Sequence, residues 1–143
     1  MSLISETNAR EHRPTNDVTK LAYIGDAVYE VYIREHVLEK SAAKIHLLNK
    51  AATRYVRAEG QAAALKRLMA EELTEEETAL VKRARNHRIS SKPQKADPVV
   101  YKLATAFEAL VGHLYLQGQK ERLEQIVALA IEIIDSSEID EKR

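Results

Sequence analysis

Residues 21–33, LAYIGDAVYEVYI, decide the fold, because apolar or aromatic side chains fall on almost every side of a helix built from them. A helix is therefore predicted over about residues 17–39, buried at the centre of the protein. The only charged residues within the stretch are Asp26 and Glu30, which lie four apart and share one face. An unpaired buried carboxylate is costly, so a cation, hydrogen-bond donors or a metal ion must compensate for it.

A second apolar helix has the same peculiarity. Residues 99–116 read VVYKLATAFEALVGHLYL, and Glu108 is the only acid among them. Gly112 lies four residues later on the same face, and Gly25 directly precedes Asp26 on the first helix. A glycine inside a helix costs about 0.5–1 kcal/mol relative to alanine, and close approach of another helix or a ligand is one reason to keep it. Either the two acids share one site, or each pairs with a Lys or Arg and the glycines only ease packing.

The remaining pattern predicts an all-α domain of about six or seven helices. Ala, Leu, Glu, Lys and Arg dominate the composition, and the β-branched residues follow helical rather than alternating spacing. The predicted helices cover residues 17–39, 41–59, 61–71, 74–85, 97–116 and 121–135, with Ser41 as an N-cap, Gly60 as an end or kink, a Thr74/Glu77 capping box, and Asp97 followed by Pro98. One domain is expected over residues 17–135, between tails at 1–16 and 136–143, with a loop at 86–96.

The composition excludes several kinds of chemistry. The chain of 143 residues has no Cys, which excludes a disulfide scaffold, a Cys-ligated zinc site and a Cys nucleophile. Its four glycines form no glycine-rich phosphate loop, and the Glu-x-x-His signature of di-iron bundles is absent. No membrane span or signal peptide is predicted, so the expected compartment is the cytoplasm. Two carboxylates without Cys or suitably spaced His favour Mg²⁺, with Mn²⁺ as a substitute.

Basic residues are concentrated between residues 82 and 102. The whole chain balances 22 Lys and Arg against 22 Asp and Glu, yet this segment has seven basic residues and one acid, a net charge of +6. It is either a solvated face or a loop that holds a phosphate backbone. The candidate phosphate or groove contacts are Arg85, Asn86, Arg88, Lys92 and Lys95. Magnesium-binding carboxylates beside such a loop point to phosphodiester chemistry.

Two motifs resemble the signatures of ribonuclease III. Residues 21–28, LAYIGDAV, resemble the first signature helix, and residues 105–112, TAFEALVG, resemble the second. The stretches at 73–77 and 82–86 are also similar to the family. The similarity covers about residues 17–135, and the two motifs stand in the family's order about 80 residues apart. In lacking a following double-stranded-RNA-binding domain, the chain resembles the compact bacterial Mini-ribonuclease III family.

The resemblance implies a homodimeric, all-α endonuclease that cuts double-stranded RNA with Mg²⁺ and leaves 5′-phosphate ends with a short 3′ overhang. It also implies a ribosomal RNA precursor as substrate, at the ends of 23S rRNA, and a helper such as a ribosomal protein to present it. Asp26 and Glu108 fall on metal-binding, catalytic acids of the family. Thr19, Ala22 and Thr105 stand where the longer enzymes have three further acids.

Two other functions remain open at this point. A non-catalytic ribonuclease III-like domain would bind structured RNA, as some ribosome-associated proteins do; the three replaced acids favour it, and the retained Asp26 and Glu108 disfavour it. A helical adaptor would use its acids only in salt bridges and would not bind RNA. Glu30 matches no metal ligand of the family and is expected either just behind the metal ligands or in a salt bridge.

Overall fold

The computed structural model describes residues 15–87 and 97–141, which form six α-helices and no strand. The all-α prediction is therefore confirmed. The predicted N-terminal tail up to residue 14 and most of the predicted loop, residues 88–96, lie outside the described residues. In chain order the helices are α2 (Val18–Lys40), α3 (Ile45–Val56), α4 (Ala58–Glu71), α5 (Glu75–Asn86), α6 (Pro98–Leu116) and α7 (Lys120–Glu141).

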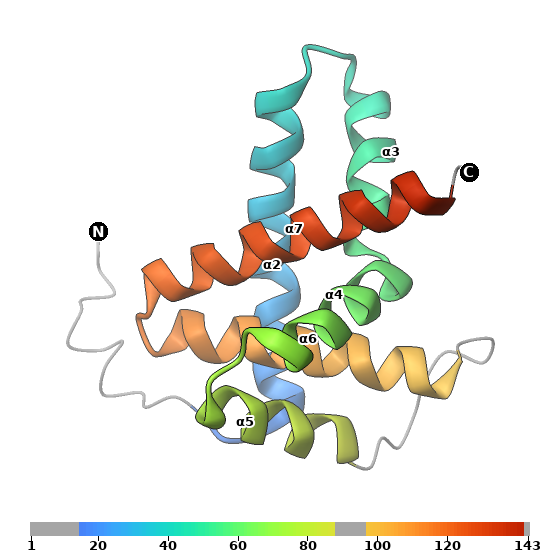
Figure 1. Ribbon diagram of the computed structural model, residues 1–143. Helices are drawn as coiled ribbons and strands as arrows, with labels where there is room; N and C mark the ends of the chain where they lie inside the picture. The colour runs from blue at the N-terminus through green and yellow to red at the C-terminus, as the bar shows by residue number, and fades with distance from the viewer. Residues whose placement is uncertain (1–14, 88–96, 142–143) are drawn as a thin grey trace, which may run out of the picture.

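Helix α6 lies at the centre, in contact with α2, α4, α5 and α7 (Figure 1). Helix α2 crosses it, and beyond the crossing α2 and α3 form a hairpin that extends away from the rest of the protein. Helix α6 also has the length and hydropathy of a membrane-spanning helix, which the sequence analysis did not anticipate. Its place at the centre accounts for that apolar character, because half of the apolar window is buried within the protein.

Two glycines set the closeness of the α2–α6 crossing. A Cβ atom on Gly25 would collide with the main-chain carbonyl of Glu108 and lie 2.8 Å from the main-chain nitrogen of Gly112. A Cβ atom on Gly112 would collide with the carbonyl of Leu21 and lie 2.9 Å from the Ile24 side chain. The expectation that these glycines permit close approach of another helix is thus confirmed, because only residues without a Cβ let the two backbones touch.

The prediction that α2 is buried on every side is wrong. Its buried residues form a single stripe at helical spacing, and the opposite face is open: Tyr23 is 84% exposed and Val31 is 57% exposed. No other described helix of the protomer covers that face. Exposed side chains as large and apolar as these, on a helix that packs against the centre of the protein, make this face a candidate contact surface.

Helix ends show where local signals succeed and where they fail. The Thr74/Glu77 capping box and the Asp97 cap with Pro98 in the first turn are present as predicted. Ser41 is not an N-cap: it follows the end of α2, and its hydroxyl accepts a hydrogen bond from the Ala43 N–H (3.0 Å), which closes a turn before α3 begins at Ile45.

Two further boundaries were also predicted wrongly. Gly60 neither ends nor kinks a helix, since the break falls earlier, at Arg57. Gly60 instead lies inside α4, where a Cβ atom would collide with the carbonyl of Arg54. Helix α7 continues to Glu141, so the predicted tail from residue 136 is helical over most of its length.

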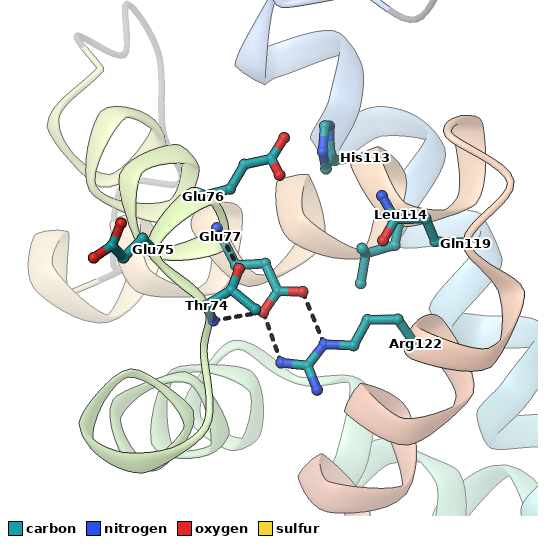
Figure 2. A pocket seen from close by; sticks show the side chains of 8 residues that line it. All are labelled: Thr74, Glu75, Glu76, Glu77, His113, Leu114, Gln119 and Arg122. Atoms are coloured by element: carbon teal, nitrogen blue, oxygen red, sulfur yellow. Dashed lines mark hydrogen bonds and ion pairs between the residues drawn. The ribbon is translucent and has the colours of Figure 1, made fainter.

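A buried ion pair joins α5 to α7. Glu77 accepts two hydrogen bonds from Arg122, at 2.8 and 2.7 Å, while its carboxylate also accepts from the Thr74 N–H (Figure 2). The pKa of Glu77 is held below its usual range, first by the hydrogen bonds from Arg122. The pocket beside this pair, about 590 Å³, also borders His113 and contains neither Asp26 nor Glu108. The pocket is therefore separate from the two acids of the α2–α6 crossing.

Candidate active site

Asp26 and Glu108 meet at the α2–α6 crossing. Asp26 directly follows Gly25 on α2 and is exposed, and Glu108 lies half-buried on α6 with its own carbonyl against Gly25. The two side chains lie close enough for their charges to repel and for a hydrogen bond between them. Among the described residues neither acid forms an ion pair with a Lys or Arg, which disfavours the purely structural interpretation of the two acids.

The environment of Glu108 opposes its ionisation. Burial, and then the negative charge of Asp26, raise the pKa of Glu108 to about 8, whereas an interaction with the Gln61 side chain acts in the opposite direction. A carboxyl held neutral beside a second carboxylate is the electrostatic situation that a bound cation relieves. The arrangement therefore favours a cation between Asp26 and Glu108.

Gln61 is a member of this site that the sequence analysis missed. Its side chain is 1% exposed, and its Nε2 donates a hydrogen bond to the carbonyl of Val56 at the end of α3 (3.1 Å). Its Oε1 has no hydrogen-bond partner among the described residues, which is unusual for a buried amide. The signal was a single amide in the apolar first turns of α4, directly after the close-packed Gly60.

The donor set fits a hard divalent cation. Mg²⁺ is commonly bound through one or two carboxylates, with waters and substrate phosphates as the remaining ligands. Asp26 and Glu108 supply those carboxylates, and the Gln61 side chain, whose interaction with Glu108 lowers the pKa of that carboxyl, favours its ionised form. No cluster of three or more His, Cys, Asp or Glu suited to a metal exists in the described part of the chain, which disfavours ions that need a full protein cage.

Glu30 takes part in a salt bridge. Its Oε2 accepts from Arg34 on the next turn of α2, at 3.1 Å from Nη2. Both side chains are substantially exposed. Of the two roles expected for Glu30, the salt bridge is the one that the structure contains.

The predicted basic loop is only partly described. Arg85 and Asn86 form the end of α5, where Arg85 is half-buried and Asn86 exposed. Arg88, Lys92 and Lys95 lie outside the described residues. The neighbouring Arg83 is engaged within the protein, since its Nη1 donates to the carbonyl of Asn16 (2.7 Å). Contact of these five candidates with a substrate stays a prediction.

Comparison with known proteins identifies relatives over most of the chain. The ribonuclease III domain family matches residues 19–119. The chain is 47% identical over 115 residues to the Mini-ribonuclease 3 of Symbiobacterium thermophilum, covering 80% of this chain and 88% of that protein. It is 45% identical over 130 residues to the Mini-ribonuclease 3 of Brevibacillus brevis, covering 91% and 96%. An X-ray structure of a Fusobacterium nucleatum protein is similar with a TM-score of 0.72 at 34% identity, covering 80% of this chain and 91% of that one.

Proposed function

Because this chain belongs to the ribonuclease III family and is an endoribonuclease, we propose that it cleaves double-stranded RNA with Mg²⁺ held by Asp26 and Glu108. The observation that carries the proposal is the meeting of these two acids, one from each signature motif, at a crossing where the helix backbones touch. Both lie on helices whose neighbouring positions are apolar, and neither has a cationic partner in the described residues. Mn²⁺ fits the same oxygen donors.

The residues of the site have separable roles. A bound Mg²⁺ supplies Lewis acidity, which lowers the pKa of water and offsets charge on the phosphate being cut. Asp26 is exposed and would meet the cation from the solvent side, whereas Glu108 is half-buried and would bind it as the ionised carboxylate. Gln61 orients Glu108 from behind while its own amide is fixed to Val56. The products are RNA ends with a 5′-phosphate and a 3′-hydroxyl.

The proposal includes a homodimer formed through the open face of α2. Tyr23 and Val31 are exposed on that face, and a groove of about 570 Å³ beside them extends from Val28 to Tyr115. Asp26 lies three residues after Tyr23, at the border of the same face. Joining two copies there would place two pairs of carboxylates on one surface, as two cuts across an RNA duplex require.

The natural substrate in this proposal is a ribosomal RNA precursor in the cytoplasm, cut at the ends of 23S rRNA. A-form duplex is recognised mainly by its shape and 2′-hydroxyls, which suits a rigid helical surface with two equivalent sites. The contacts are largely to phosphates, so affinity falls steeply with salt. We expect a helper, such as a ribosomal protein on the same precursor, to present the duplex.

The decisive experiment compares Asp26→Asn with Glu30→Gln on a duplex RNA, with Mg²⁺ or with EDTA. Losing several kcal/mol of charge stabilisation lowers the cleavage rate about a thousandfold for Asp26→Asn. Glu30→Gln removes an acid four residues away, in an exposed pair, and should change the rate less than about threefold. Full activity of Asp26→Asn, or cleavage that survives EDTA, would refute the proposal; binding without cleavage by the wild type would support the non-catalytic alternative.

A further inference from the structure

A second basic segment lies on α3, outside the segment that charge counting had singled out. Residues 40–57 contain five Lys and Arg and no acid. His46 and Lys50 on α3 and Arg57 directly after its end are all exposed and are spaced by four and seven, so they continue one side of the helix, opposite the buried Leu48 and Tyr55. We call these three residues the cationic stripe; at 1.5 Å per residue it is about 16 Å long.

The stripe is not used to stabilise the protein. Lys50 and Arg57 form no ion pair in the described part of the chain. Arg54, by contrast, is committed to the fold, with its Nη2 2.8 Å from Asp135 on α7. Exposed lysines on helices usually gain from an acid one turn away, and α3 offers none.

The N-terminal end of α3 also lacks the usual local stabilisers of a helix, although Arg54 in its last turn is favourable there. Its N-cap position is Lys44, which makes no side-chain cap, and its first turn has no acid although acids are favourable there. Helix α5 follows the opposite pattern, with Glu75, Glu76 and Glu77 in its first turn and a full capping box. Because no side-chain cap or first-turn acid stabilises the N-terminal end of α3 and no acid on the helix pairs with the exposed Lys50, the basic character of the segment indicates a function outside the fold.

The backbone at the Arg57 end of the stripe is linked to Glu108 through one buried side chain. Val56, the residue before it, accepts the hydrogen bond from Gln61, and Gln61 interacts with Glu108. One turn from Asp26, Tyr29 donates to the carbonyl of Tyr55 (3.0 Å). The end of α3 that carries Arg57 is thus the end joined to the α2–α6 crossing, and from there α3 extends outward as one arm of the α2–α3 hairpin (Figure 1).

We propose that the cationic stripe binds the phosphate backbone of duplex RNA on its way out from the cut site. This inference rests on the proposed function. An extended row of positive charge that leads away from a phosphodiester-cutting centre matches the regular row of phosphates of one RNA strand. An acidic protein is the alternative partner, and the experiment below distinguishes the two.

The test compares two charge-matched double variants of the full chain. Lys50→Gln/Arg57→Gln changes the stripe, and Lys66→Gln/Arg67→Gln removes two exposed cations from α4. Each is placed in the Asp26→Asn background, and binding to a duplex RNA that extends well beyond the cut is measured over a range of salt concentrations. The stripe variant should lower the slope of log Kd against log salt by about 1 for each lost contact, and the α4 variant should leave it unchanged.

With Asp26 intact, the stripe variant should raise KM for the same duplex and leave kcat unchanged, while both doubles melt like the wild type. An unchanged salt slope, or an equal fall in the α4 variant, would overturn the inference. RNA cleavage by the stripe variant with an unchanged KM would also overturn it, and would leave an acidic protein as the partner of the stripe. If the wild type neither binds nor cuts the duplex, the proposed function fails instead.

Discussion

The two halves of helix α2 are held in different ways. The first half meets α6 backbone to backbone through Gly25 and Gly112, with no space for a single methyl group. The second half meets α3 through side chains and leaves a cavity of about 270 Å³ beside His36 and Lys40. The tight half carries the carboxylates, whereas the second half packs against the buried side of α3, opposite the cationic stripe. A close contact between helix backbones requires glycines, which are visible in the sequence. A contact between side chains requires no particular residue and so cannot be recognised from the sequence alone.

The largest loss of stability is expected from a substitution in the tight half of α2. Gly25→Ala puts a methyl group onto the carbonyl of Glu108, and main-chain atoms cannot yield as a flexible side chain does. We expect a loss of about 3 kcal/mol or more in unfolding free energy, measured by urea denaturation. Gly118→Ala is the control: it has open space but a positive φ of 72°, so it should cost only about 1 kcal/mol. Equal losses in the two variants would show that the close contact is unimportant.

The next largest effect is expected at Tyr29, the residue of α2 that contacts both α6 and α3. Tyr29 packs edge-on against Phe107 of α6, with 4.9 Å between ring centroids, and donates its hydroxyl to the carbonyl of Tyr55 on α3. Tyr29→Phe keeps the ring and leaves the buried carbonyl without this donor, so we expect a loss of about 2 kcal/mol. Hydrogen exchange should then speed up in α3 more than in α6; uniform acceleration would contradict a linking role.

A smaller effect of opposite sign concerns Glu108. Its carboxyl ionises near the ordinary value of 4.5 in the unfolded chain, but its pKa is about 8 in the folded chain without metal. The folded state therefore binds the extra proton, and stability is full below pH 4.5 and lost as pH rises towards 8. Glu108→Gln should remove this dependence and stabilise the metal-free protein by about 1 kcal/mol at pH 8.

Urea unfolding in EDTA at pH 5 and pH 8 measures that difference. The same variant should lose cleavage activity, because it loses a carboxylate of the proposed metal site. A Glu108→Gln chain that is less stable than the wild type at pH 8 would show that the carboxylate is structural.

The smallest effect is expected on the solvent side of α2. Arg34→Gln breaks the Glu30–Arg34 pair, and both of its side chains are substantially exposed. Its cost should stay below about 0.5 kcal/mol, with cleavage changed less than twofold. A larger loss of activity would show that Glu30, like Asp26, contributes to cleavage.

The sequence made the helices and the two acids predictable for physical reasons. Carboxylates and glycines are costly inside apolar helices, so Asp26, Glu108, Gly25 and Gly112 were visible without any structure. The capping box at Thr74 is a strictly local device and was also predicted correctly.

Features that depend on three-dimensional packing were not predictable. Gln61 resembled an ordinary polar residue of a helix, because its burial depends on how α4 meets α3 and α6. The open face of α2 was predicted to be buried, since hydrophobicity along a sequence does not reveal whether the covering partner is the same chain or another. Ser41 is a residue type typical of N-caps, but its hydroxyl stabilises the turn between α2 and α3. Helix α3 begins only at Ile45, after that turn.

The backbone contact at the α2–α6 crossing also bears on how this protein can change over evolutionary time. Core side chains drift among Leu, Ile, Val and Met with small compensating shifts, and such drift gradually alters distances across a packed interior. The separation of the Asp26 and Glu108 backbones is fixed by peptide groups in contact, so it is insulated from that drift. Substitutions among the core side chains around the two acids should therefore be tolerated, whereas replacement of Gly25 or Gly112 by any residue with a Cβ should not.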